Sequence, residues 1–150
     1  YNPSTGGTQI LDTASNLILV GSPGVNLAAY HYNRLTTWDG RPLLEVLFYR
    51  NVSRGQNYLE VKANGKRYYM EFDGQGRLRA DYAAIQILRD EYGRYVMLVY
   101  GLGAEGTRIA SEILKNYDQW SLKGQAVIIK YYDSDGDGHL DTATIIETIP

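Results

Sequence analysis

Apolar residues along this chain fall mostly into short runs, which is the pattern of buried β-strands. Turn-forming residues, above all glycine and proline, separate these runs. The pattern predicts strands over 16–21, 42–50, 57–63, 66–72, 82–90, 95–100, 125–132 and 142–149. Between the third and fourth runs, Asn64 and Gly65 predict a tight hairpin turn with positive φ at both central residues.

Two stretches change to helical spacing. In the first, we expect Ser22 to cap a helix that has Pro23 at its first position. The apolar face of this helix would be formed by Val25, Ala28, Tyr32 and Leu35. A second helix is predicted over 107–117, with an apolar stripe formed by Ile109, Ala110, Ile113 and Leu114.

The order of these elements predicts an α/β fold, with a mixed β-sheet, β-hairpins and two main helices. The 150 residues fit one domain, so we expect a flexible N-terminal segment over 1–8 and a single domain over 9–150. No run reaches the roughly 18 apolar residues of a membrane span, so no membrane insertion is expected.

Composition narrows the classes of function. The formal net charge of −2 gives no sign of a nucleic-acid partner, and the absence of cysteine excludes disulfides and thiolate metal sites. The 14 tyrosines stand against 2 phenylalanines, a bias that suits surfaces in contact with other surfaces. Residues 34–94 include 11 basic and 8 acidic residues, whereas 95–150 include 4 and 8. This asymmetry fits attraction between copies, although an ordinary solvated surface explains it more simply.

The most specific motif is "DSDGDGHLD" at 133–141, where four carboxylates would repel one another on folding. A divalent cation would turn that repulsion into attraction. The spacing matches positions 1, 3, 5, 7 and 9 of a calcium-binding loop, with glycine at position 6 for the sharp turn. The predicted Ca²⁺ site consists of Asp133, Asp135, Asp137, the backbone carbonyl of His139, and Asp141, with Gly138 at the turn. A solvated acidic hairpin is the alternative.

This motif departs from the EF-hand, because Thr144 stands where a bidentate glutamate is expected and the flanking segments are predicted strands. We therefore expect a calcium-binding β-hairpin at the C-terminus that clasps two strands and does not open as a sensor. Without the bidentate ligand, the dissociation constant should lie in the range of roughly 10⁻⁴–10⁻³ M found for extracellular modules. Such a site fills where calcium is plentiful, which points outside the cell.

A rival motif is "GLGAEG" at 101–106, which places Gly101, Gly103 and Gly106 between a predicted strand and a predicted helix. This context suits a dinucleotide-binding turn and would make the chain a nucleotide-binding or enzymatic Rossmann-like domain. However, the acid at the tip of the next strand, Asp133, lies 27 positions beyond Gly106 and is already assigned to calcium. A tight turn with close packing explains the glycines more simply.

Other candidate chemistry is sparse. Ser22 lies in "VGSPG", where Val20 replaces the first glycine of a nucleophile elbow. His31 stands between two tyrosines, where a surface or packing role is the simpler interpretation. Asn51 begins an N-x-S sequon, which makes it a candidate for glycosylation. We therefore predict no catalytic residues and no enzymatic activity.

Three segments together resemble domains of archaeal surface-layer (S-layer) proteins. They are "NLILVGSPGVNLAAY", "YGRYVMLVYGLGAEGTRIASEIL" and "LKGQAVIIKYYDSDGDGHLDTATI", at 16–30, 92–114 and 122–145. The resemblance lies in their order: a V-G-x-P-x-V-N turn, a hairpin leading into a helix, and a calcium-like strand pair. It implies a secreted α/β module without enzymatic activity that packs against copies of itself or against neighbouring surface-layer domains. Surface-layer chains are usually much longer than this one.

The sequence therefore predicts a structural extracellular protein of an archaeal cell surface, stabilised by calcium, that self-assembles into a sheet, tube or filament. Two alternatives stay open. One is the nucleotide-binding or enzymatic domain that uses the glycine-rich turn. The other is a carbohydrate- or surface-binding module of an exported protein.

Overall fold

The computed structural model describes residues 15–53, 55–120 and 122–150, so the expected flexible segment over 1–8 lies outside the described residues. The elements, in chain order, are β1 (Leu17–Val20), α1 (Leu27–Arg34), β2 (Val46–Asn51), β3 (Gln56–Val61), β4 (Arg67–Tyr69), β5 (Glu71–Phe72), β6 (Leu78–Arg89), β7 (Tyr95–Gly101), α2 (Ala104–Lys115), the 3₁₀ turn η1 (Tyr117–Gln119), β8 (Ala126–Tyr132) and β9 (Thr142–Ile149).

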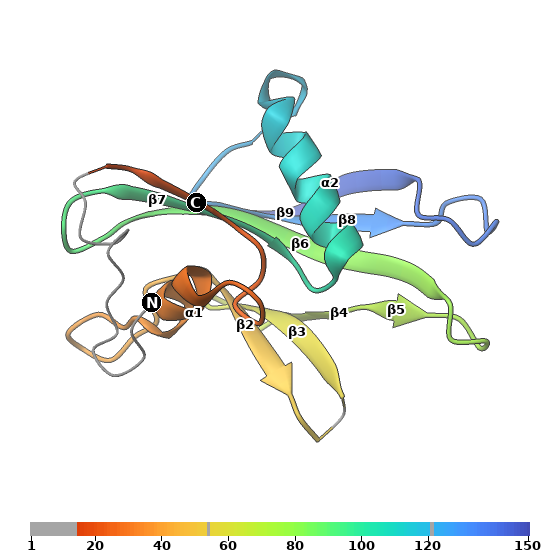
Figure 1. The fold of residues 1–150 in the computed structure, drawn as a ribbon, viewed down its shortest axis with the longest axis horizontal. Coiled ribbons are helices and arrows are strands. Elements are labelled where there is room, and N and C mark those ends of the chain that lie inside the picture. Colours follow the sequence, from red (N-terminus) through yellow and green to blue (C-terminus); the bar gives the residue numbers. More distant parts are fainter. Residues whose placement is uncertain (1–14, 54, 121) are drawn as a thin grey trace.

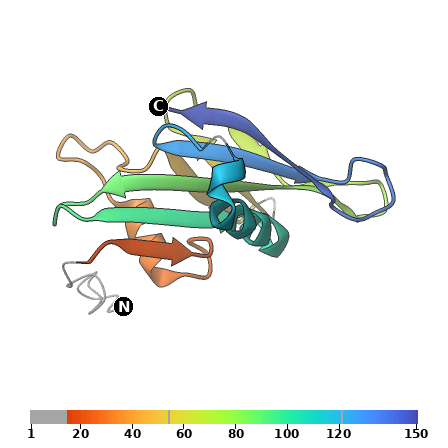
Figure 2. The same ribbon diagram turned by 90° about the horizontal axis from the view of Figure 1, so that it is seen from above.

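Most strands belong to one six-stranded sheet. Its order is β1-β7-β6-β8-β9, and β5 pairs with β6 beside this path. Strands β1 and β7 are parallel, whereas the other pairs are antiparallel. Figure 2 shows the five strands side by side, with α2 crossing one face. The predicted mixed sheet with β-hairpins and two helices is therefore confirmed.

Strands β2, β3 and β4 form a second, antiparallel sheet of three strands, which the sequence did not predict. Helix α2 covers one face of the large sheet, while α1 and the small sheet lie on the opposite side (Figure 1). Successive side chains of β6 point to opposite faces of the large sheet. Ala84 packs in the core with the small sheet, whereas Ala83 and Ile85 pack in the core with α2.

A buried amide joins the two sheets. The Gln86 side chain of β6 accepts a hydrogen bond from the backbone N–H of Val46 at 3.1 Å and donates to the Val46 carbonyl at 2.8 Å. It also donates to the hydroxyl of Tyr100 at 2.7 Å. The Gln86 amide thus bonds to the N–H and the carbonyl of Val46 as a neighbouring strand would. The buried backbone groups of Val46 therefore have hydrogen-bond partners where the two sheets meet.

The first helix begins later than its sequence pattern predicts. Ser22 does not cap it; the residue before the helix is Asn26, whose Oδ1 accepts hydrogen bonds from the N–H groups of Ala28 and Ala29 at 3.0 and 3.1 Å. The carbonyl of Ser22 instead accepts from Val25 and Asn26, which closes a turn around Pro23. Val25 is consequently 82% exposed and not part of the helix face.

Two further boundaries differ from the prediction. The β3–β4 hairpin is present, but only Gly65 has positive φ, at 67°. Asn64 keeps an ordinary φ and uses its Oδ1 to accept from the N–H of Lys66 at 2.9 Å, so the turn is wider than a two-residue one. Helix α2 starts at Ala104, three residues before the predicted 107.

Candidate metal centre

The acidic motif forms the loop between β8 and β9. These strands are antiparallel neighbours, and Tyr132 stands opposite Thr142 where they lead into the loop. The loop extends past the start of α2 and lies beside the β5–β6 loop (Figure 2). Gly136 and Gly138 both have positive φ, at 85° and 96°, which lets the chain turn tightly enough to fold the carboxylates back on one another.

Three of the predicted ligands meet in this loop. Carboxylate oxygens of Asp133, Asp135 and Asp141 all lie within 4.8 Å of one another. Two oxygens bound to one calcium ion at 2.3–2.6 Å are at most about 4.6–5.2 Å apart, so this spacing fits a shared ion. Hard oxygen donors are also the class that calcium prefers. The residues therefore fit Ca²⁺ in both chemistry and spacing.

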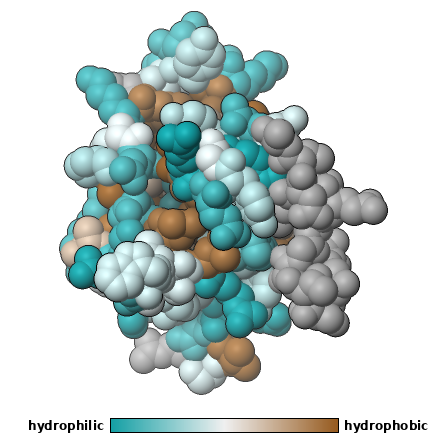
Figure 3. Space-filling view, turned by 90° about the vertical axis from the view of Figure 1, so that its left-hand side faces the viewer, coloured by the Kyte–Doolittle hydropathy of each residue, from teal (hydrophilic) through white to brown (hydrophobic). Residues whose placement is uncertain are grey.

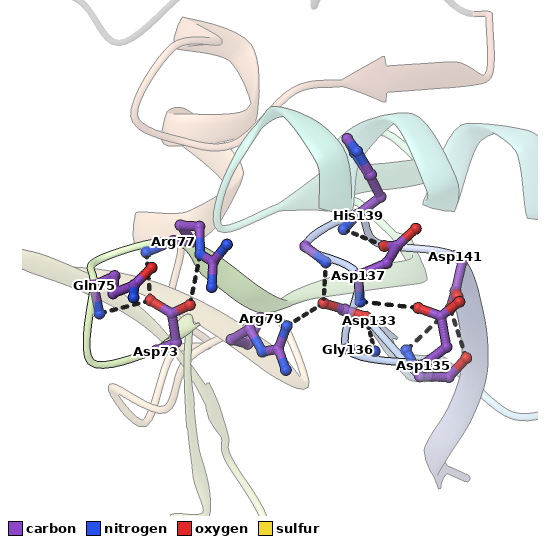
Figure 4. Close-up of polar contacts among 12 residues, drawn as sticks. Asp73, Gln75, Arg77, Arg79, Asp133, Asp135, Gly136, Asp137, His139 and Asp141 are labelled. Atoms are coloured by element: carbon purple, nitrogen blue, oxygen red, sulfur yellow. Dashed lines mark hydrogen bonds and ion pairs between the residues drawn. The ribbon is translucent and has the colours of Figure 1, made fainter.

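Asp137 and His139 contribute differently. Within the described residues, the acidic group that meets this spacing does not include Asp137. Its Oδ1 accepts a hydrogen bond from the N–H of His139 at 2.8 Å, a contact that Figure 4 shows beside the cluster. Asp135 likewise accepts from the N–H of Asp137 at 3.1 Å. These bonds between neighbours hold the loop in a compact form.

Asp133 is the most constrained carboxylate of the loop, and its side chain is fully buried. Its two oxygens accept from the N–H groups of Gly136 at 2.6 Å and Gly138 at 2.8 Å. The guanidinium of Arg79, from β6, pairs with the same carboxylate. Burial alone would raise the pKa of Asp133, but these hydrogen bonds and the charge of Arg79 outweigh it, so the pKa lies below its usual value.

Asp141 approaches the cluster from the far strand. Its Oδ1 accepts from the backbone N–H and the hydroxyl of Ser134, at 3.1 and 2.9 Å. Hydrogen bonds from the side chains of Thr142 and Ser134 hold the pKa of Asp141 below its usual value. Since Asp133 and Asp141 both favour the ionised form, the loop keeps its negative charge at neutral pH.

A second acidic turn lies next to this loop, between β5 and β6 (Figure 4). The Oδ1 of Asp73 accepts from the N–H groups of Gln75 and Arg77, and its Oδ2 accepts from the Arg77 guanidinium at 2.8 Å. These bonds, first of all the one from the Arg77 backbone, lower the pKa of Asp73 to about 2. With Arg79, this turn places two arginines beside the four aspartates of 133–141.

The glycine-rich turn binds a carboxylate from the protein itself. Asp81 of β6 is fully buried, and its carboxylate accepts from the N–H of Gly106 at 2.7 Å and from that of Gly103 at 3.1 Å. A third hydrogen bond comes from the N–H of Tyr82 at 2.8 Å. Burial raises the pKa of Asp81, while these three donors oppose the rise. A carboxylate thus takes the place at the start of α2 where a dinucleotide would present its phosphate.

The three glycines make this close approach possible. A Cβ on Gly103 would lie 2.8 Å from the Asp81 carboxylate, and one on Gly106 would lie 2.9 Å from it. A Cβ on Gly101 would lie 2.5 Å from the backbone carbon of Gly106. These short distances favour the interpretation of "GLGAEG" as a tight turn with close packing.

The remaining sequence candidates lie elsewhere. His31 is on α1 with its ring edge against Tyr32, and burial lowers its pKa. Asn51 ends β2, and its Oδ1 accepts from the hydroxyl of Ser53 at 2.8 Å beside the 84% exposed Val52. Ser22 lies in the turn before α1 and is 8% exposed. None of these three is part of the acidic loop.

Sequence reasoning missed the two residues that complete these sites, Arg79 and Asp81. Both lie on β6, far along the chain from the loops they contact. The available signal was weak: each is a charged residue at the start of an otherwise apolar run. Their partners depend on the pairing of β6 with β8 and β7, which places Ala80 opposite Tyr132 and Ala83 opposite Gly101.

Comparison with protein families, with curated proteins and with solved structures finds no match to this chain. Among the residues that the structure describes, no helix combines the length and the apolar character needed to span a bilayer.

Proposed function

We propose that this chain is a calcium-stabilised structural module of an extracellular protein at an archaeal cell surface, and that copies of it assemble with one another. The observation that carries the proposal is the gathering of Asp133, Asp135 and Asp141 at the tip of the β8–β9 hairpin. A calcium ion would supply positive charge there. The three carboxylates would bind it, and Gly136 and Gly138 hold Asp133 in position for this.

The loop's connections support a structural role for the ion. Arg79 ties Asp133 to β6, and the backbone N–H of Asp133 donates to the Arg79 carbonyl at 3.1 Å. The loop is therefore anchored to the central strand of the sheet as well as to its own hairpin. An ion that fixes the loop would stiffen this end of the molecule, which suits a building block better than a sensor.

The edges of the large sheet support assembly. In the described residues, β1 pairs only with β7 and β9 only with β8, so each offers one open side. Strand β1 has no charged residue and no proline, and its Ile18 and Val20 are 65% and 51% exposed. Natural sheets usually protect such edges, and an unprotected edge pairs readily with another chain. Figure 3 shows hydrophobic patches between hydrophilic side chains on one end of the molecule.

The archaeal surface-layer part of the proposal rests on the three sequence segments. In the fold they are the β1–α1 unit, the β6–β7 turn continuing through β7 into α2, and the β8–β9 hairpin with its loop. Together these segments supply β1, β7, β8 and the start of β9 to the large sheet, but not its central strand β6. The rival nucleotide-binding function is less favoured, because the N–H groups of Gly103 and Gly106 already donate to Asp81.

An assembly experiment tests this function. We expect the purified protein to form ordered assemblies in millimolar Ca²⁺, visible by electron microscopy and light scattering, and to return to small species when EGTA is added. The variant Asp135→Asn should assemble poorly, because it removes one negative charge from the ion's ligands. Asp118→Asn, an exposed aspartate on η1, is the matched control and should behave as the unaltered chain does. A protein that stays monomeric at high concentration both with calcium and with chelator would refute self-assembly.

A further inference from the structure

A cavity of about 420 Å³ lies beside the β1–α1 turn, away from the acidic loop. The turn lines one side of it, and the ends of β2 and β3 line the other. Its volume lies within the range of roughly 300–1,000 Å³ that is usual for small-molecule sites. Three of its residues, Ser22, Val25 and Leu102, also line a second cavity of about 540 Å³ at the start of α2. A bound molecule therefore has room to extend in that direction.

The strand pairing of the small sheet places two polar side chains at this cavity. Arg50 stands directly opposite Asn57 in the β2–β3 register, so their side chains share a face. Phe48 lies two residues earlier on β2 and points to the same face, where it is buried. Beyond Phe48 this face leaves the core, so Arg50 and Asn57 border the cavity.

Polar groups without partners converge on the cavity. Ser22 is 8% exposed, yet within the described residues its hydroxyl has no hydrogen-bond partner. Across the part of the chain that the structure describes, the guanidinium of Arg50 likewise forms no ion pair, and the amide of Asn57 forms no hydrogen bond. No buried side-chain polar atom among the described residues lacks a hydrogen-bond partner, so the Ser22 hydroxyl opens onto the cavity, where it can bond to a ligand.

We propose that this cavity binds a small organic carboxylate. The Arg50 guanidinium pairs with the carboxylate, because its planar fork matches that group. Asn57 and Ser22 donate further hydrogen bonds, and the body of the ligand lies against Phe48 and Leu102. Among the described residues that line the cavity, Arg50 carries the positive charge. This site is independent of the proposed calcium loop.

An NMR titration of the ¹⁵N-labelled chain tests the proposal. Sodium phenylacetate and sodium D-glucuronate are the two probes, which share a carboxylate and differ in having an apolar or a hydroxylated body. We expect saturable shifts in the amides of the β1–α1 turn and of β2 with at least one probe. Arg50→Gln should weaken that binding by at least about tenfold, and Ser22→Ala by about threefold. Arg50→Lys, which keeps the charge but loses the fork, should fall between the unaltered chain and Arg50→Gln.

The controls decide the ligand class. Lys115→Gln removes a cation at the end of α2 that has no ion pair in the described residues, and it should leave the affinity within about twofold. The proposal is overturned if neither probe gives saturable shifts, if neutral phenylacetamide or inorganic phosphate binds as well as the carboxylates, or if Arg50→Gln and Arg50→Lys both bind as the unaltered chain does. Saturation by phenylacetate alone assigns an apolar body to the ligand, and saturation by glucuronate alone assigns a sugar acid.

Discussion

Replacing Asp81 by alanine should lower the free energy of unfolding by about 3–5 kcal/mol. The carboxylate is fully buried and accepts hydrogen bonds from the N–H groups of Gly103, Gly106 and Tyr82. Alanine would leave these donors without their acceptor, and each such buried group costs about 1–3 kcal/mol. The substitution also removes a negative charge from the positive end of α2. Urea denaturation followed by circular dichroism measures the change.

Two further variants separate the causes. Asp81→Asn keeps one acceptor oxygen but loses the charge, so its loss of stability should be smaller than that of alanine. Asp118→Ala removes an exposed aspartate from η1 and should change the free energy of unfolding by no more than about 0.5 kcal/mol. If Asp81→Ala cost less than about 1 kcal/mol, the carboxylate would not be the acceptor that holds the start of α2.

Replacing Gly101 by alanine should also be severe, with an expected loss of about 3–5 kcal/mol. A Cβ at this position would lie 2.5 Å from the backbone carbon of Gly106 and 2.6 Å from its Cα. Both atoms belong to the backbone of α2, so no side chain can move aside to make room. The helix would have to shift away from β7, and the hydrogen bond from the Gly101 N–H to the Thr107 hydroxyl, 2.9 Å long, would be lost.

Gly74→Ala is the matched control for this substitution. Gly74 lies in the β5–β6 loop, does not have positive φ, and a Cβ there would meet no atom within 4 Å. We expect its free energy of unfolding to stay within about 1 kcal/mol of that of the unaltered chain. Thermal or chemical unfolding of the two variants side by side provides the comparison. Equal stability of Gly101→Ala and Gly74→Ala would contradict the close packing of β7 on α2.

Much of the fold could be predicted from local patterns. The runs at 125–132 and 142–149 became β8 and β9 almost residue for residue, because short runs rich in β-branched residues and bounded by turn residues are typical of strands. The apolar stripe of the second helix was predictable for the same reason. Its start was not, because the cap comes from Asp81, a residue on another strand, and nothing local to Gly103 marks it.

The start of α1 shows a competition between two turns. Ser22 followed by Pro23 is a common way to begin a helix. Here Asn26 caps the helix instead, with its Oδ1 accepting from two backbone N–H groups while its Nδ2 donates to the Val20 carbonyl at 2.9 Å. That second bond ties the cap to β1, which is a tertiary contact and therefore invisible to helical spacing.

For the acidic loop, the sequence predicted the aspartates and their spacing but not their contacts with distant residues. The pattern identified all four aspartates, and the structure brings Asp133, Asp135 and Asp141 together. It could not anticipate Arg79, which lies 54 positions before Asp133 in the sequence and reaches it through the β6–β8 pairing. The separate small sheet was missed for a similar reason, since each strand's period of two says nothing about which sheet it joins.

Calorimetric titration of Ca²⁺ into chelator-treated protein tests the central claim most directly. The account predicts one saturable binding event with a dissociation constant of roughly 10⁻⁴–10⁻³ M. Asp135→Asn should abolish it, and Asp118→Asn should retain it. Asp135 is the better position to vary, because Asp133 also pairs with Arg79 and its loss would disturb the fold. No saturable heat at millimolar calcium, or the same titration curve for Asp135→Asn as for the unaltered chain, would contradict the account.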